Sequence, residues 1–166
     1  VREVEQRLTA AGCPDADFDA RELFQLATGR DVRLSDRPLT AEQAAALEVL
    51  CTRRAAREPL QYLCGSWSFL DFELAVGPGV LCPRADTEVV AQAAAETLAG
   101  IAAPRVLDLC AGTGCLGLGV KRFCPAAQVT CVEKSPAAFA YLEKNARCAL
   151  TGQGSQTENV LEPSAL

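Results

Sequence analysis

Apolar residues in the first part of the chain recur at spacings of three and four, which is typical of amphipathic helices. The first stripe consists of Val1, Val4, Leu8 and Ala11. Gly12 interrupts this stripe, and a second one begins at Phe18 and ends before Gly29. The pattern therefore predicts two helices joined by a short loop.

A third helix is predicted by a capping signal. Thr40 followed by Gln43 has the form of a capping box, in which each side chain bonds the backbone N–H of the other residue. The apolar positions that follow keep helical spacing until Pro59 closes the helix. We expect these helices to bury their stripes against one another in a small helical bundle over residues 1–58.

The pattern changes after Pro59. The stretch SWSFLDFELAV, residues 66–76, nearly alternates around Asp71 and predicts a β-hairpin. A turn at 77–79 and an extended segment follow, and Asp86 is expected to cap a helix that runs to about Leu98. Residues 59–82 therefore form a predicted linker that contains the hairpin.

Strands and helices alternate from Arg105 onward. Short apolar runs at 106–109 and 129–132 predict buried strands, each followed by a helical stretch, and a third strand is expected near 159–161. Such alternation indicates a parallel, doubly wound sheet of the Rossmann-like type. The fold class is thus α/β, with a helical bundle followed by a partial doubly wound domain over 83–166.

Composition narrows the possible functions. The 166 residues are 49% hydrophobic and 22% charged, with a net charge of −5, as in a globular protein. No apolar run approaches the roughly 20 residues that span a bilayer, and no basic face indicates direct nucleic-acid binding. The chain has nine Cys but no His, and no C-x-x-C pair, so we expect no metal and reduced cysteines in a cytoplasmic protein.

The clearest chemical signal is a glycine-rich turn at 108–115, DLCAGTGC, between the first strand and the next helix. Its glycines allow a ligand to approach backbone N–H groups at a helix N-terminus. Glu133 ends the following strand, where a carboxylate can accept both hydroxyls of a ribose. The same residues satisfy the G-x-G-x-x-G pattern of a dinucleotide site, so the turn alone does not identify the ligand.

Asp108 distinguishes the two ligands. A carboxylate at the strand end repels a pyrophosphate placed against the turn but suits a ligand with an ammonium or sulfonium group, such as S-adenosylmethionine. The electrostatics therefore favour the methyl donor, while a turn that only packs helix on strand stays open. Asn159, at the start of the predicted third strand, is either a contact to the adenine edge or a polar turn residue.

Three segments resemble the HemK/PrmC-type peptide chain release factor glutamine methyltransferases. They are REPLQY at 57–62 with Gly65, GVLCPRADTE at 79–88, and the turn at 108–114. The resemblance implies methyl transfer from S-adenosylmethionine to the side-chain amide of the Gln in the Gly-Gly-Gln motif of class 1 release factors. It also implies that the helical domain recognises this protein substrate, whereas the residues alone leave open a merely stabilising bundle.

The resemblance also assigns residues to the site. It places Cys110, Ala111, Gly112, Thr113 and Gly114 at the methionine end of the cofactor, Glu133 at the ribose, and Asn159 with Val160 beside the adenine. Arg84 and Glu88 are candidates for the mouth of the active site, or they form an ion pair at helical spacing.

The chain departs from the family's pattern in three places. Cys110 stands where the family usually has Gly, and Asn159 where it more often has Asp or Glu. The family's Asn-Pro-Pro-Tyr motif, which grips the substrate amide, is absent from these residues. We therefore expect a C-terminally truncated methyltransferase with little or no catalysis of its own.

The alternatives are a related methyltransferase acting on a ribosomal protein or nucleic-acid amino group, and a non-catalytic cofactor-binding or docking module.

Overall fold

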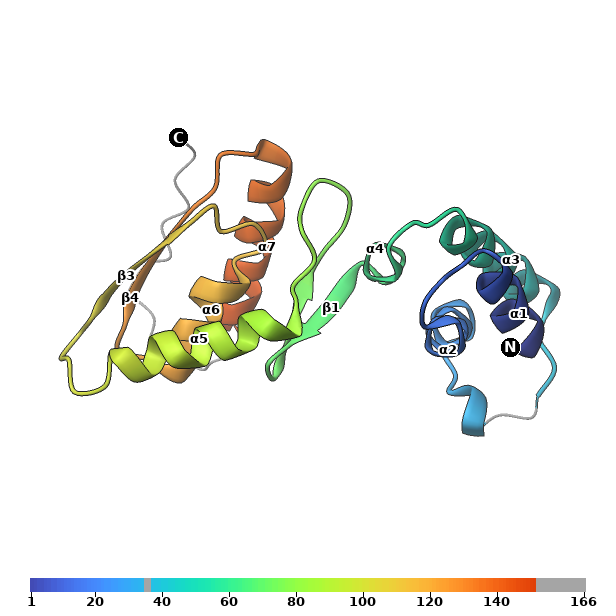
Figure 1. Ribbon diagram of the computed structural model, residues 1–166, viewed down its shortest axis with the longest axis horizontal. Helices are drawn as coiled ribbons and strands as arrows, with labels where there is room; N and C mark the ends of the chain where they lie inside the picture. Colours follow the sequence, from blue (N-terminus) through green and yellow to red (C-terminus); the bar gives the residue numbers. More distant parts are fainter. Residues whose placement is uncertain (35–36, 152–166) are drawn as a thin grey trace. The chain divides into compact units, whose positions relative to one another are not determined.

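The computed structural model describes residues 1–34 and 37–151, and the chain divides into two units, Val1–Cys64 and Gly65–Leu166 (Figure 1). The division falls inside the segment 59–82 that the sequence predicts to be a linker. Helix α4 (Leu60–Cys64) groups with the first unit, and the hairpin groups with the second. Within the described ranges, no helix combines the length and the apolar character that crossing a bilayer requires.

The first unit is helical, as predicted. Its elements are α1 (Arg2–Ala10), α2 (Ala16–Thr28), the short 3-10 helix η1 (Val32–Leu34), α3 (Ala41–Ala55) and α4. The core of this unit includes Leu8, Ala20, Leu23, Phe24, Leu47 and Cys51, all buried. The apolar stripes of the sequence therefore do meet inside a bundle.

The predicted start of α3 and the predicted end of α2 are confirmed. Gln43 N donates to Thr40 Oγ1 over 3.2 Å, and Thr40 N donates to Gln43 Oε1 over 3.1 Å, which completes the capping box. Gly29 ends α2 in the left-handed conformation, with φ of 69°. Helix α3 already ends at Ala55, before Pro59, because the chain turns through a left-handed Arg57 with φ of 71°.

A buried ion pair joins α2 to α3. Arg54 Nε lies 2.8 Å from Asp19 Oδ2, and the two side chains are 12% and 5% exposed. Arg54 Nη1 also donates to the carbonyl of Glu58 over 3.0 Å. The Arg54 guanidinium thus bonds both the Asp19 carboxylate and the Glu58 carbonyl. A buried charge needs such partners because it has lost its contacts with water.

The second unit begins with the predicted hairpin and continues as alternating helices and strands. Its elements are β1 (Ser66–Phe69), β2 (Phe72–Ala75), α5 (Ala85–Thr97), β3 (Arg105–Leu109), α6 (Cys115–Phe123), β4 (Gln128–Val132) and α7 (Pro136–Thr151). Strands β1 and β2 pair antiparallel, with Phe69 opposite Phe72. The predicted third strand lies outside the described residues.

The start of α5 differs from the prediction. Arg84 occupies the cap position with extended backbone, and Asp86 lies in the first turn instead of capping the helix. A carboxylate in the first turn still stabilises the helix through its dipole. The expected helix is therefore present, but the prediction that Asp86 caps it is wrong.

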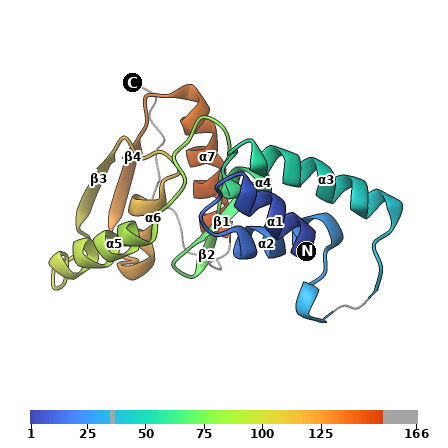
Figure 2. The same ribbon diagram turned by 45° about the vertical axis from the view of Figure 1, so that its right-hand side comes forward.

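Strands β3 and β4 pair in parallel, with Asp108 beside Cys131, as the alternating pattern predicts. Figures 1 and 2 both show α6 and α7 on the same side of these strands. On that side Val129 and Cys131 pack with Leu142 of α7 in a buried cluster. Leu107 and Leu109, which alternate with Asp108 along β3, are 60% and 63% exposed.

Helix α6 lies directly on the two strands because it carries a glycine at the contact. A Cβ on Gly117 would lie 2.7 Å from Cys131 Sγ and 3.0 Å from Asp108 Oδ2. No side chain fits there unless the helix moves away from the sheet. This close approach brings the backbone of α6 within hydrogen-bonding distance of Asp108.

Candidate cofactor site at the glycine-rich turn

The turn between β3 and α6 has an unusual backbone. Cys110, Gly112 and Gly114 adopt positive φ angles of 59°, 58° and 81°. Two of these positions are glycines, for which this conformation has no steric cost, but Cys110 is not. The sequence did not predict a left-handed backbone at Cys110. The Cys110 thiol is exposed.

Glu133 holds the beginning of the turn. Its Oε2 accepts a hydrogen bond from Gly112 N over 2.8 Å, and its Oε1 accepts one from Ser135 N over 2.8 Å. Ala111 N also donates to the carbonyl of Val132 over 3.0 Å. The bond from Ser135 is the main reason that the pKa of the Glu133 carboxyl is lowered, and the bond from Gly112 adds to it. A carboxyl group that loses its proton more readily than usual therefore lies just after β4.

Asp108 holds the other end of the same segment. This residue is 7% exposed, and its Oδ2 accepts a hydrogen bond from Gly117 N, in the first turn of α6, over 2.9 Å. Burial raises the pKa of the Asp108 carboxyl, the bond from Gly117 opposes this, and the charge of Glu133 adds to the rise. The two candidate carboxylates thus bond the two ends of the segment 112–117, which the sequence did not predict.

Asn145 of α7 holds the middle of the turn. Its Nδ2 donates to the carbonyl of Thr113 over 2.9 Å, and Thr113 itself is 2% exposed. Asn145 was not among the candidate residues. The available signal was weak: a polar residue on a helix face whose other members, Leu142 and Ala146, are buried.

The extended segment after the hairpin borders the turn. Val80 is buried, and its Cγ2 lies 3.8 Å from the position that a Cβ on Gly112 would occupy. Gly79 lies against α7, since a Cβ there would be 2.8 Å from the Cβ of Ala137. The turn is therefore enclosed by β4, α7 and residues 79–80.

The remaining candidate residues lie elsewhere. Glu88 Oε1 accepts a hydrogen bond from Leu70 N, in the hairpin turn, over 2.8 Å. Arg84 is exposed, and the ion pairs of the described residues include none between Arg84 and Glu88, so the structure does not support the alternative in which the two residues pair. Asn159 and Val160 lie outside the described residues.

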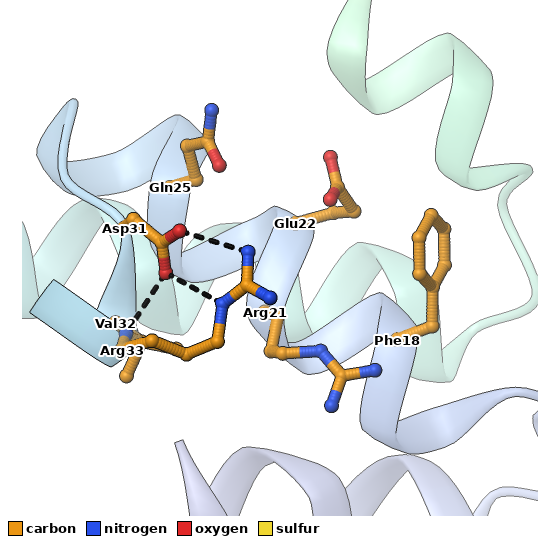
Figure 3. A pocket seen from close by; sticks show the side chains of 7 residues that line it. All are labelled: Phe18, Arg21, Glu22, Gln25, Asp31, Val32 and Arg33. Carbon is orange, nitrogen blue, oxygen red and sulfur yellow. Dashed lines mark hydrogen bonds and ion pairs between the residues drawn. The ribbon is translucent and has the colours of Figure 1, made fainter.

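A separate hollow lies on the surface of the first unit. It has a volume of about 320 Å³ and is lined by Phe18, Arg21, Glu22, Gln25, Asp31, Val32 and Arg33. Figure 3 shows Phe18 and Glu22 projecting side by side from α2, with Asp31 bonded to Arg33 at the other end. Phe18 is 41% exposed, whereas Leu23 of the same helix is fully buried.

The cysteines do not form pairs or clusters. All nine are free thiols, of which Cys13, Cys51 and Cys131 are buried. Burial raises the pKa of the Cys131 thiol to about 12. Over the part of the chain that the structure covers, no group of three or more Cys, Asp or Glu residues is arranged to hold a metal ion.

Comparisons with known proteins agree with the two units. Residues 1–65 match the PrmC N-terminal domain, and residues 72–163 match the methyltransferase small domain. The chain is 39% identical over 154 residues to the release factor glutamine methyltransferase of Bifidobacterium longum, covering 87% of this chain and 52% of that protein. It is 41% identical over 143 residues to the protein of the same name from Geobacter sulfurreducens, covering 84% and 50%.

The chain spans about half the length of the curated relatives that it matches. The methyltransferase model alone covers more than half of the chain, including the turn, both parallel strands and α5 to α7. On this ground, the chain belongs to the methyltransferase small domain family and carries a PrmC-type domain in front of it.

Proposed function

We propose that the glycine-rich turn binds S-adenosylmethionine. The observation that carries this proposal is the pair of carboxylates on the turn, with Glu133 bonded to Gly112 N and Asp108 bonded to Gly117 N. They surround the turn with negative charge and occupy N–H groups that a pyrophosphate would need. A sulfonium cofactor with an ammonium group meets no such repulsion. S-adenosylmethionine supplies an electrophilic methyl group when bound.

The roles of the site residues follow from this assignment. Residues 110–114 would line the methionine end of the cofactor, where the left-handed backbone brings main-chain atoms close to the ligand. Each oxygen of Glu133 accepts one N–H bond and retains lone pairs for the ribose hydroxyls. Asn159 and Val160 are proposed beside the adenine.

We further propose that the whole protein is a cytoplasmic methyltransferase acting on the Gln of the Gly-Gly-Gln motif in class 1 release factors. The names of the relatives support this acceptor. In the reaction S-adenosylmethionine would supply its methyl group to the amide nitrogen, and S-adenosylhomocysteine and one proton would be released. The Asn-Pro-Pro-Tyr motif is absent from these 166 residues, so we expect the chain to bind the cofactor with little turnover.

The hollow on α2 is our candidate for protein docking. Arg21 pairs with Asp17 over 2.9 Å, and Arg33 pairs with Asp31 over 2.9 Å, so these charges balance within the first unit. Glu22 has no ion-pair partner among the residues of the described ranges. The hollow thus offers a carboxylate that takes part in none of the described ion pairs, beside the exposed ring of Phe18.

This combination suits a Lys or Arg side chain of the release factor. Such a side chain places its apolar stem on an aromatic ring and its charge near the carboxylate. The alternative, a bundle that only stabilises the enzyme, predicts that substitutions in the hollow leave release-factor binding unchanged.

Calorimetric titration of the chain with S-adenosylmethionine and with NAD tests the cofactor. We expect saturable binding of S-adenosylmethionine and none of NAD at the same concentrations. Binding of NAD alone would overturn the proposal and favour a dinucleotide site.

For the acceptor, immobilised chain should retain a class 1 release factor more strongly than a ribosomal protein. Equal or reversed retention would refute the release-factor assignment.

A further inference from the structure

A single buried amide connects the hairpin to the glycine-rich turn. Asn145 is 3% exposed. Its Oδ1 accepts a hydrogen bond from Ala75 N over 2.7 Å, while its Nδ2 donates to Ala75 O over 3.1 Å and to Thr113 O over 2.9 Å. One side chain on α7 thus bonds two segments that lie 70 and 32 residues away in sequence.

The hairpin register explains why Ala75 is available for these bonds. In an antiparallel pair, bonded and non-bonded residue pairs alternate along the strands. Phe69 and Phe72 flank the two-residue turn, and Ser66 opposite Ala75 is three pairs further along. This places both polar backbone groups of Ala75 away from β1, where the Asn145 amide takes the place of a neighbouring strand.

The third bond acts on the turn itself. The peptide unit between Thr113 and Gly114 is held at both ends, because its carbonyl accepts from Asn145 and its N–H donates to Ala111 O over 2.8 Å. Glu133 bonds the preceding residue, Gly112, from the other side. The orientation of this peptide decides which backbone groups the turn presents to a ligand.

We propose that Asn145 is a positioning residue for the cofactor: it holds the Thr113–Gly114 peptide against the hairpin in the orientation that accepts S-adenosylmethionine. The inference rests on the proposed function of the turn. A rigid, preorganised turn binds more tightly because less ordering is required on binding. Asparagine fits this role because its donor and acceptor lie in one plane, as in a peptide group.

The first test compares Asn145→Asp with Leu74→Ala. The aspartate keeps an acceptor for Ala75 N but has no donor for the two carbonyls. Leu74 is 1% exposed in the adjacent position of β2 and packs in a buried cluster with Phe69, Ala91 and Leu118, so its truncation lowers stability without removing a hydrogen bond of the turn. Both variants are titrated with S-adenosylmethionine at a temperature at which circular dichroism shows them folded.

We expect Asn145→Asp to bind S-adenosylmethionine at least about tenfold more weakly than the unsubstituted chain, since a lost bond with a buried unpaired carbonyl costs that much. Leu74→Ala should stay within about twofold. Equal losses of S-adenosylmethionine affinity in the two variants would overturn the positioning role of Asn145 but not the proposed function of the turn. If the unsubstituted chain itself fails to bind S-adenosylmethionine, the proposed function fails and this inference with it.

A second measurement needs no variant, in case Asn145→Asp does not fold. Amide hydrogen exchange of the unsubstituted chain is followed with and without S-adenosylmethionine. We expect saturation to slow exchange of the Ala75 amide, which bonds Asn145, and to leave the Leu70 amide, which bonds Glu88, unchanged. The same change, or no change, at both amides would contradict the connection through Asn145.

Discussion

Glu133 at the end of β4 accepts a hydrogen bond from the backbone N–H of Gly112 over 2.8 Å. The residue expected to contact the ribose is therefore also part of the frame of the turn. A carboxylate that already holds the backbone is fixed in orientation before a ligand arrives, which reduces the ordering required on binding. Asp108 is fixed in orientation in the same way, because it accepts a hydrogen bond from Gly117 N at the other end of the segment 112–117.

Replacing Glu133 should affect cofactor binding strongly. Glu133→Ala removes the acceptor for Gly112 N and Ser135 N together with the proposed ribose contact. We expect roughly tenfold to hundredfold weaker binding of S-adenosylmethionine, measured by calorimetry. Glu143→Ala is the matched control, because the Glu143 side chain on α7 is 43% exposed and forms an ion pair with Arg147. Unchanged affinity in Glu133→Ala would contradict the assignment.

Asp108 should make stability depend on pH. Burial raises the pKa of its carboxyl, so the folded chain binds this proton more tightly than the unfolded chain. The contribution of Asp108 to the free energy of unfolding is thus most favourable below the ordinary carboxyl pKa, and it falls as pH rises through the raised value.

Asp108→Asn isolates this effect, because the amide oxygen still accepts from Gly117 N but carries no titrating proton. Between the ordinary carboxyl pKa and the raised pKa of Asp108, the free energy of unfolding of the variant should increase with pH relative to that of the unsubstituted chain. Above the raised pKa this difference should level off. Urea denaturation at a series of pH values measures it. A difference that is independent of pH, or that decreases as pH rises, would refute the prediction.

Gly117 should not tolerate even a methyl group. In Gly117→Ala the new Cβ meets Cys131 Sγ at 2.7 Å, so α6 must shift away from the sheet. We expect a loss of about 1–3 kcal/mol in the free energy of unfolding, despite the better helix propensity of alanine. The double variant Gly117→Ala, Cys131→Ala should recover part of this loss. Strictly additive effects in the double-mutant cycle would show that the two residues do not clash.

Phe18 should matter for the partner and not for the fold. Its ring is 41% exposed in the hollow on α2, so Phe18→Ala is expected to change the free energy of unfolding by under about 1 kcal/mol. Release-factor affinity should fall by about tenfold, as for a contact of moderate energy. Leu26→Ala is the control, since Leu26 is 43% exposed on the same helix but does not line the hollow. Equal affinities for the two variants would argue for a purely stabilising bundle.

The ion pair between Arg54 and Asp19 should dominate the electrostatic stability of the first unit. Arg54→Met leaves the Asp19 carboxylate, 5% exposed, without its cation, and we expect a loss of about 3–5 kcal/mol. Arg7→Met breaks the exposed pair with Glu48, which water screens, and should lower the free energy of unfolding far less. Thermal or urea unfolding of both variants measures this contrast, and similar losses would contradict it.

Local signals in the sequence were sufficient for most of the fold. The capping box of α3, the glycine that ends α2, the hairpin around Asp71 and the strand–turn–helix at 105–123 all depend on residues within a few positions of one another. Such features are determined by backbone preferences and apolar spacing, which a sequence displays directly. Asp86 was assigned to the wrong position because caps are sensitive to a shift of one or two residues.

Contacts between distant segments were decided only by the tertiary structure. The sequence placed Asp108 and Glu133 near the turn, but their hydrogen bonds to Gly117 and Gly112 depend on how closely α6 lies on the strands. The sequence left open whether Glu88 pairs with Arg84 or lines the mouth of the active site, and in the structure it bonds the hairpin turn at Leu70. No local pattern distinguishes such pairings, because a side chain bonds whichever unpaired backbone group packing brings to it.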